Sequence, residues 1–249
     1  MSTQLRNTKL AFGVEQSRSL FRLRLARYKA LAEAVADYLK EKEPEKRQFA
    51  LLDVGVGSGR SMRYIESESL SDRINFYGID NSVRRLSNVY ASHQWGLTRS
   101  DIEKGIPFKS ALFDIVLFEQ VLEHLVNPSS VIEEIARVLR PDGLLVVGVP
   151  IFPWGISHIR KLIVYISARW FGVTRSHLQA FDTMSIKSLV SANNRFNIRQ
   201  HYGFRIVSGG LLTPLENFLW WYRFNRGLGR ILPALCTEIQ IIARRNPAL

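Results

Sequence analysis

A glycine-rich loop with an acid at its base is the part of the sequence that most clearly indicates chemistry. Residues 51–59 read LLDVGVGSG and place Asp53, Gly55, Gly57 and Gly59 between an apolar run and a helical pattern. Glycines at such a turn allow positive φ and close approach of a ligand, and the following helix offers free N–H groups. The spacing is neither the G-x-G-x-x-G of dinucleotide-binding proteins nor a P-loop ending in Gly-Lys. The acid at the base favours a ligand that carries an ammonium group.

Two further acids follow the next two apolar runs. Asp80 ends the run over 74–79, and Asp101 follows the short run over 96–99. A carboxylate at the end of the second strand can accept both hydroxyls of a ribose. Asp101 is placed to accept from an exocyclic amine. The loop and the two acids, in this order, favour a nucleoside ligand over a plain tight turn.

The elements that position these residues are short apolar runs alternating with helical patterns. Apolar runs that do not alternate with polar residues indicate a parallel sheet covered on both faces, and right-handed crossovers then give a doubly wound α/β fold. Arg140–Gly143 (RPDG) is expected to be a turn. We expect strands at 49–54, 74–79, 96–99, 112–118, 144–149, within 196–207 and at 238–243, and helices at 17–42, 58–68, 82–90, 129–139 and 183–193.

With these motifs the sequence resembles the class I S-adenosylmethionine-dependent methyltransferases. It is most similar to the small-molecule group that includes ubiquinone- and menaquinone-pathway methyltransferases. The resemblance runs over about 49–150 and includes IPF at 106–108, FDIVLFEQVLEHL at 113–125 and VLRPDGLL at 138–145. It implies a mostly parallel, seven-stranded Rossmann-like sheet in the order 3-2-1-4-5-7-6, with the last strand antiparallel. It also implies the cofactor S-adenosyl-L-methionine.

The resemblance implies a role for each motif in holding that cofactor. The glycine loop and its acid would surround the methionine moiety, and the acid after the second strand would bind the ribose. Asp101 and the backbone at Ile102 would hold the adenine, and the end of the fourth strand would lie near the sulfonium. The implied cofactor residues are Asp53, Gly55, Gly57, Gly59, Asp80, Asp101, Ile102, Phe118, Glu119 and Gln120.

Methyl transfer from a sulfonium mainly requires that two substrates be positioned and water excluded, with a base where the acceptor must lose a proton. Candidate catalytic residues are His124, His177 and Glu119. His124 precedes an Asn-Pro pair and can equally brace the next helix, and Glu119 also fits a role in the cofactor pocket. His177 lies in SHLQAF, which resembles a segment near the substrate cleft in this family. No cluster with metal-ligand spacing is visible, so we expect transfer without a metal.

Domain organisation follows from changes in composition along the chain. We expect a helical cap over 1–48 and the methyltransferase domain over 49–249, with a helical insertion over 149–195 and the end of the sheet over 196–249. One cysteine, Cys236, excludes a disulfide framework and fits a reducing compartment. The net charge of +12 is uneven, because residues 151–249 hold 13 Lys and Arg against 3 acids.

This basic part is also rich in tryptophan and has an apolar stripe at helical spacing over 156–170. It could touch an anionic membrane, with 211–224 as a second aromatic anchor, or be ordinary core over a substrate pocket. Nucleic acid is argued against because no recognised module is present. We expect a cytoplasmic enzyme, peripheral at a membrane where the basic part docks, that methylates an oxygen of a small-molecule or lipid-linked acceptor. The alternatives are an RNA or protein methyltransferase and a non-catalytic cofactor-binding scaffold.

Overall fold

A single seven-stranded sheet forms the centre of the molecule. The computed structural model describes residues 26–45, 47–67, 70–87, 89, 96–151, 179–206 and 210–247. The order is β3-β2-β1-β4-β5-β7-β6, with β7 antiparallel to both of its neighbours, which confirms the expected order. The other neighbouring pairs are parallel. The strands are β1 Phe49–Val54, β2 Ile74–Asp80, β3 Gly96–Arg99, β4 Phe113–Glu119, β5 Leu139–Pro150, β6 Phe196–Phe204 and β7 Glu238–Arg245.

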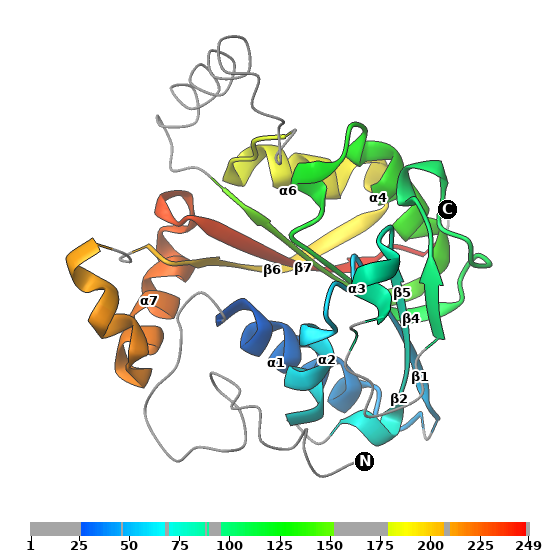
Figure 1. Ribbon diagram of the computed structural model, residues 1–249, viewed down its shortest axis with the longest axis horizontal. Coiled ribbons are helices and arrows are strands. Elements are labelled where there is room, and N and C mark those ends of the chain that lie inside the picture. The colour runs from blue at the N-terminus through cyan, green and yellow to red at the C-terminus, as the bar shows by residue number, and fades with distance from the viewer. Residues whose placement is uncertain are drawn as a thin grey trace.

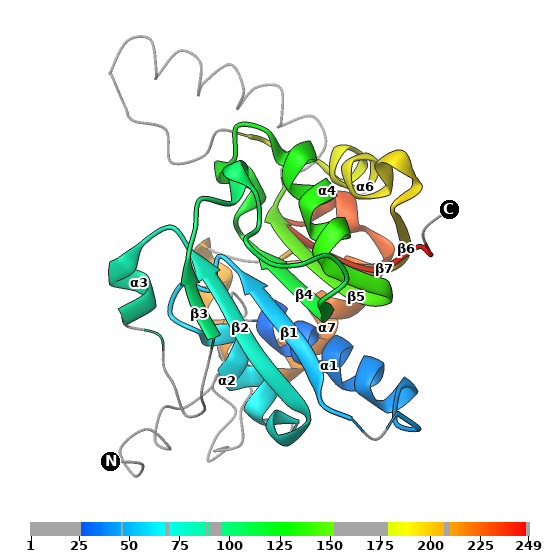
Figure 2. The same cartoon turned by 90° about the vertical axis from the view of Figure 1, so that its right-hand side faces the viewer.

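Helices cover both faces of this sheet. In Figure 1, α4 and α6 lie on one face and α1 and α2 on the other, and Figure 2 shows the same layers from the side. The helix α7 packs against β6 and shares the buried cluster of α1 and α2. The α-helices are α1 Ala26–Glu41, α2 Arg60–Ser67, α3 Val83–Ser87, α4 Pro128–Val138, α6 Thr183–Ser191 and α7 Leu219–Ile231. Single turns of 3-10 helix include η3 Ile102–Lys104, η4 Leu122–His124 and η7 Pro233–Leu235, and a longer one is η6 Gly210–Asn217.

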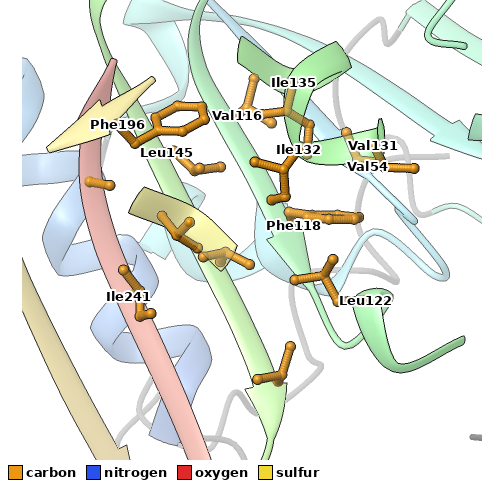
Figure 3. Close-up of a cluster of buried hydrophobic side chains, with 14 of the residues drawn as sticks. Val54, Val116, Phe118, Leu122, Val131, Ile132, Ile135, Leu145, Phe196 and Ile241 are labelled. Atoms are coloured by element: carbon orange, nitrogen blue, oxygen red, sulfur yellow. The ribbon is translucent and has the colours of Figure 1, made fainter. Parts of the chain in front are cut away.

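The core on the α4 side shows why these residues form these elements. The side chain of Asn127 accepts a hydrogen bond from the Ser130 N–H (3.4 Å), and proline in the first turn fits the start of α4. The helix then buries Ile132 and Ile135 against Val116 and its neighbours in the sheet (Figure 3). Every residue of β4 is buried, as expected for a strand covered on both faces.

The expected turn over 140–143 lies inside the bounds of β5. These residues pair with no residue of β4, because Phe113 pairs with Leu139 and the next partners are Ile115 and Leu144. Asp142 takes the left-handed conformation (φ 58°). The four residues make a local bulge opposite Asp114, after which β5 resumes its pairing with β4.

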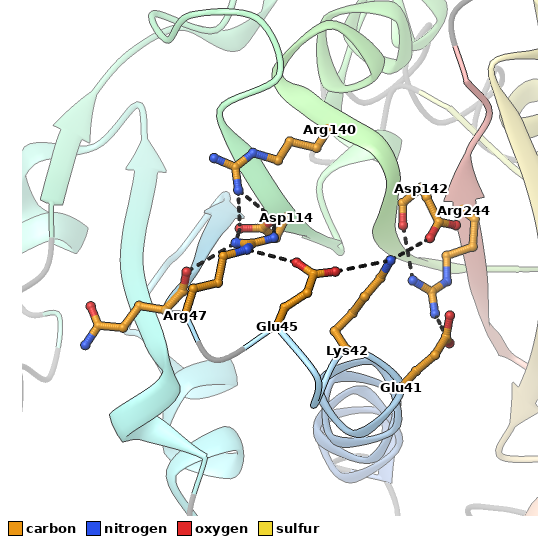
Figure 4. A network of polar contacts seen from close by, with 9 residues as sticks. Glu41, Lys42, Glu45, Arg47, Asp114, Arg140, Asp142 and Arg244 are labelled. Carbon is orange, nitrogen blue, oxygen red and sulfur yellow. Dashed lines mark hydrogen bonds and ion pairs between the residues drawn. The ribbon is translucent and has the colours of Figure 1, made fainter.

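A network of ion pairs fixes the connection between α1 and β1 at the amino ends of β1 and β4 (Figure 4). Asp114 is 1% exposed and accepts hydrogen bonds from Arg47 (2.7 and 3.0 Å), Arg140 (2.8 and 3.0 Å) and the Ala50 N–H (2.9 Å). Burial alone would raise the pKa of Asp114, but these donors hold the pKa below its usual value. The network lies at the edge of the sheet opposite the glycine loop.

Candidate active site

The glycine loop after β1 needs glycine at several positions. Gly55, Gly57 and Gly59 have φ of 80°, 56° and 70°, the left-handed region that disfavours other residues. At Gly55 a Cβ would also clash with Cγ2 of Val121. The N–H groups of Gly55 and Val56 donate to the Ile79 carbonyl (2.8 and 3.0 Å), which ties the loop to β2. The loop therefore keeps its shape without a ligand.

A cavity of about 200 Å³ opens between this loop and the ends of β1 and β4. The strand order of the sheet runs outward from β1 to β2 and β3 on one side and from β4 to β5 on the other, so it reverses between β1 and β4. Such a switch point is the usual place for a ligand in a doubly wound sheet. The volume is below the roughly 300–1,000 Å³ of sites for drug-sized ligands, so the cavity accommodates one end of such a ligand. Its lining residues are Tyr28, Asp53, Gly55, Val56, Gly57, Ser58, Arg60, Ser61 and Glu119.

Two buried carboxylates line the cavity and each has an oxygen with no hydrogen-bond partner. Asp53 is 3% exposed, and burial raises its pKa to about 7 despite a hydrogen bond with Ser61. Glu119 is 8% exposed, and burial raises its pKa to about 7 against the opposing charge of Arg27, whose Nε lies 3.8 Å from Oε2. Buried acceptors without donors are costly, so a cationic N–H donor is the ligand group that suits them.

Asp80 adjoins the same loop. Its Oδ2 accepts from the Gly57 N–H (3.2 Å) and its Oδ1 from the Ser82 N–H (2.9 Å), while Arg85 lies 3.5 Å from Oδ1. A carboxylate oxygen has a second lone pair, so each can still accept a hydroxyl proton. The structure thus places a further carboxylate with free lone pairs beside the loop, and its role toward a ribose stays a prediction.

Asp101 lies next to Asp80 at the ends of β2 and β3, since the Ser100 N–H donates to the Asp80 carbonyl (3.2 Å). Its exposed side chain caps η3 by accepting from the Glu103 N–H (3.2 Å), and Ile102 is buried beneath it. Neither residue lines the described cavity, and their roles toward the adenine stay predictions.

The three cofactor-binding residues predicted at the end of β4 lie in different environments. Phe118 is fully buried in the α4-side core, whereas the side chain of Glu119 lines the cavity. Gln120 has a left-handed conformation (φ 56°), and its N–H donates to the Gly148 carbonyl (2.8 Å). Of the three, the structure brings only Glu119 to the cavity.

Of the predicted catalytic residues, Glu119 and His124 lie in the described part of the chain. His124 lies in η4 with 47% of its side chain exposed, and its Nε2 is 3.9 Å from Oε1 of Glu123. His177 lies outside the described residues, as does the apolar stripe over 156–170. The Gln179 N–H donates to the Glu123 carbonyl (3.0 Å), so the described end of the SHLQAF segment reaches η4. The catalytic assignments stay predictions.

Several residues of the site were missed by the sequence analysis. Arg60 and Ser61 directly follow the loop, and continuing the loop motif into the first turn of α2 would have found them. Tyr28 and Arg27 come from α1, and Gln240 comes from β7, and no local pattern marks them. Within the described ranges, no group of three or more His, Cys, Asp or Glu could hold a metal ion.

Comparison with known proteins agrees with this geometry. Residues 52–147 match a protein family described as a methyltransferase domain. A ubiquinone biosynthesis O-methyltransferase of Hahella chejuensis is 35% identical over 115 residues, which are 43% of this chain and 45% of that protein. An uncharacterized methyltransferase of Mycolicibacterium vanbaalenii is 30% identical over 176 residues, which are 68% of this chain and 66% of that protein.

A solved structure, the plantazolicin methyltransferase BpumL in complex with a triazolic desmethylPZN analog and SAH, has the same fold, with a TM-score of 0.57 and 15% identity over 90% of this chain and 86% of that one. The fold and the loop define a Rossmann-like methyltransferase domain. Residues 52–147 form a domain of the class I S-adenosylmethionine-dependent methyltransferases, the family whose cofactor is S-adenosylmethionine. It matches less than half the length of the ubiquinone-pathway relative, so its acceptor is a matter for proposal.

Proposed function

We propose that this chain transfers the methyl group of S-adenosylmethionine to an oxygen of a small-molecule or lipid-linked acceptor. The observation that carries the proposal is the pair of buried, incompletely bonded carboxylates, Asp53 and Glu119, beside a glycine loop at the switch point of the sheet. The acceptor class is supported by the relative from Hahella chejuensis, which is named for ubiquinone biosynthesis and O-methylation.

The residues of the site would orient the cofactor from one end to the other. Asp53 and Glu119 would hold the ammonium end, with Tyr28 closing that side of the cavity. Asp80 would accept the ribose hydroxyls, and Asp101 with the backbone of Ile102 would hold the adenine. The bound cofactor supplies an activated methyl carbon and a thioether leaving group, so the protein needs only to align an acceptor and exclude water.

Charge and protons balance in a single displacement. The acceptor oxygen forms a bond to the methyl carbon as the carbon–sulfur bond breaks, and the electron pair stays on sulfur. The acceptor hydroxyl loses its proton to a base near the attack, for which His124 and His177 are the candidates. The elements after β5, over 149–195, are proposed to cover the acceptor.

A lipid-linked acceptor would bring the chain to a membrane. The basic residues of 151–249 favour the anionic, cytoplasmic face of such a membrane. The described residues contain no helix long and apolar enough to cross it. We therefore propose peripheral contact of a cytoplasmic enzyme.

The test is incubation of the full chain and a cell extract with cofactor labelled in its methyl group, followed by separation of lipid, RNA, protein and small molecules. Label in the lipid or small-molecule fraction is expected, and it should fall strongly at low cofactor concentration when Asp80→Ala replaces the wild type. Label in RNA or protein would show that the acceptor class is wrong. Cofactor binding in calorimetry without label in any fraction would favour the scaffold alternative.

A further inference from the structure

The helix α7 buries one side and exposes a second, apolar side. Trp221 and Tyr222 are 7% and 3% exposed and belong to the core shared with α1. Trp220, Phe224 and Ile231 are 54%, 46% and 76% exposed. The spacing i, i+4, i+11 places these three on one stripe, opposite the buried residues. Large apolar side chains are thus aligned on a surface that the rest of the described chain leaves uncovered.

The apolar stripe has a basic flank. Arg223 and Arg230 are exposed and lie seven residues apart, so they lie on the same side of the stripe. Arg230 also lies over the ring of Tyr202 (5.1 Å to the centroid). Arg226 is less exposed and pairs with Glu33 (2.5 Å) and the Tyr222 hydroxyl (2.8 Å). Glu216 is the single acid in the sequence over 210–237. We call Phe218, Trp220, Arg223, Phe224, Arg230 and Ile231 the α7 face.

We propose that the α7 face docks on an anionic lipid surface. Tryptophan and phenylalanine beside arginine are the composition of interfacial helices, in which rings enter the headgroup region and the cations meet lipid phosphates. Each arginine near an anionic surface contributes about 1 kcal/mol, so the two arginines with the rings suffice for reversible binding.

A second copy of the chain fits this face less well than lipid does. In a two-fold symmetric contact the same patch meets itself, so in an antiparallel pairing of two α7 helices Arg223 and Arg230 would approach the arginines of the second copy. The α7 face holds no acid that could pair with them. An anionic lipid surface, by contrast, presents negatively charged headgroups to both arginines.

The end of α7 lies at the same edge of the sheet as the cofactor cavity. A Cβ at Gly229 would clash with the Gly203 carbonyl near the end of β6, and Phe204 at that end pairs with Glu238 at the start of β7. Glu238 pairs with Arg27 (3.1 Å), whose Nε lies 3.8 Å from the Glu119 carboxylate in the cavity wall. Docking of α7 on a membrane would therefore orient the edge of the sheet that contains the cofactor cavity toward the membrane. The inference rests on the peripheral membrane contact proposed above and deepens it by naming the surface, and it does not depend on which acceptor is methylated.

The experiment is sedimentation of the full chain with vesicles of phosphatidylcholine alone and of phosphatidylcholine with phosphatidylglycerol, at about 0.05 M and about 0.5 M salt. Binding is expected only to the anionic vesicles, and the higher salt should release the protein. Trp220→Ala with Phe224→Ala, and separately Arg223→Glu with Arg230→Glu, should each weaken binding at least about tenfold. Lys40→Glu with Lys109→Glu makes the same change of charge at exposed positions elsewhere and should have little effect.

Gly227 gives a second variant that removes no contact. It is exposed at the centre of the stripe, and a Cβ there meets nothing within 4 Å. Gly227→Glu should weaken vesicle binding, while Gly227→Gln, its neutral counterpart, should retain it. Both should bind cofactor in calorimetry as the wild type does, because the cavity does not include α7.

Three results would overturn the proposal. One is failure of the wild type to bind anionic vesicles at low salt. Another is vesicle binding that the α7 variants leave unchanged. The third is self-association of the lipid-free wild type, measured by sedimentation velocity, that the same variants abolish while vesicle binding persists, which would assign the face to a second copy. Each result leaves cofactor binding, and with it the proposed methyl transfer, to be judged separately.

Discussion

Gln240 donates a hydrogen bond to Glu119 across the strand that separates them. The Nε2 to Oε1 distance is 2.6 Å, although Gln240 is in β7, Glu119 is in β4, and β5 lies between the two. Gly148 of β5 pairs with Glu119 on one side and with Gln240 on the other. A Cβ at Gly148 would clash with the Glu119 carboxylate. The missing side chain therefore lets the carboxylate cross β5 and hold its place in the cavity wall.

Replacing Gly148 by alanine should displace the Glu119 carboxylate. We expect a loss of roughly 1–3 kcal/mol in the free energy of unfolding, from overpacking and from a strained buried hydrogen bond, and weaker cofactor binding. Urea denaturation and calorimetry measure the two effects. Gly227→Ala is the control, since its added Cβ meets nothing within 4 Å. Equal behaviour of both alanine variants would show that Gly148 has no such role.

Asp80→Ala should weaken cofactor binding by roughly 1.5–3 kcal/mol, or about 10- to 150-fold, because the ribose hydroxyls would lose a charged acceptor. The substitution also leaves the N–H groups of Gly57 and Ser82 without their acceptor, so the loop itself should loosen. The exposed acid Asp72 supplies the control substitution Asp72→Ala. Calorimetric titration with S-adenosylhomocysteine measures both. Unchanged affinity in Asp80→Ala would contradict the assigned role.

Cofactor affinity should rise with pH through about 7. Burial raises the pKa of Asp53 and of Glu119 to about 7 in the ligand-free protein. The ionised carboxylates attract the ammonium group, so binding below about pH 7 must release protons. Titrations at pH 6 and 8, in buffers of different ionisation enthalpy, count those protons. Affinity and proton count that do not vary with pH would show that these groups do not face the cation.

The raised pKa values of Asp53 and Glu119 also affect the stability of the ligand-free protein. A carboxyl whose pKa is raised on folding binds more protons in the folded than in the unfolded state between about pH 4 and 7. The free energy of unfolding is therefore expected to fall as the pH rises over that window, and Asp53→Asn should reduce the fall. Urea denaturation at several pH values measures the slope.

Asp114 should contribute stability with the opposite dependence on pH. Its lowered pKa means that the contribution is present above the ordinary carboxyl pKa of about 4 and is lost as the pH falls below it. Asp114→Asn should cost about 2 kcal/mol at pH 7, less than for a fully buried pair because its arginines reach solvent. The difference from wild type in urea denaturation should shrink at about pH 3. A cost that is equal at both pH values would sink this account.

Methyl transfer should not depend on a divalent ion, since transfer to an aligned acceptor needs only a base. EDTA should leave the rate of label transfer to the extract unchanged. If EDTA removed activity and Mg²⁺ restored it, the prediction would be wrong. A chelator without effect on cofactor binding but with effect on transfer would locate the metal on the acceptor side.

Local patterns predicted the parts of the site that are contiguous in the sequence. The loop with Asp53, and the acid that ends β2, could be located because each follows its own apolar run. Arg27 and Glu238 could not be paired, because 211 positions separate them and only the antiparallel return of β7 brings them together. The order of the strands came from the resemblance to a family and not from periodicity.

Tertiary contacts decide two points that local patterns leave open. RPDG carries a strong turn signal, and residues 140–143 leave the ladder, yet Leu139 and Leu144 on either side of them both pair with β4. The aromatic run over 211–224 was interpreted either as a membrane anchor or as ordinary core, and the structure buries Trp221 and exposes Trp220. In both cases tertiary contacts, which act between segments distant in the sequence, decide between conformations that local propensity leaves open.

Ion pairs and a hydrogen bond hold the helix α1 at both of its ends, and this affects the entropy of cofactor binding. At its start, Arg27 pairs with Glu238 (3.1 Å) and its carbonyl accepts from Gln240 (3.2 Å). At its end, Glu41 pairs with Arg244 (2.5 Å), and Lys42, just beyond it, pairs with Asp142 (2.9 Å). The wall of the cavity that Tyr28 forms is therefore preorganised, so its ordering adds no entropic cost when the cofactor binds. Amide hydrogens of α1 should accordingly exchange at nearly the same slow rate in the free and the cofactor-bound protein.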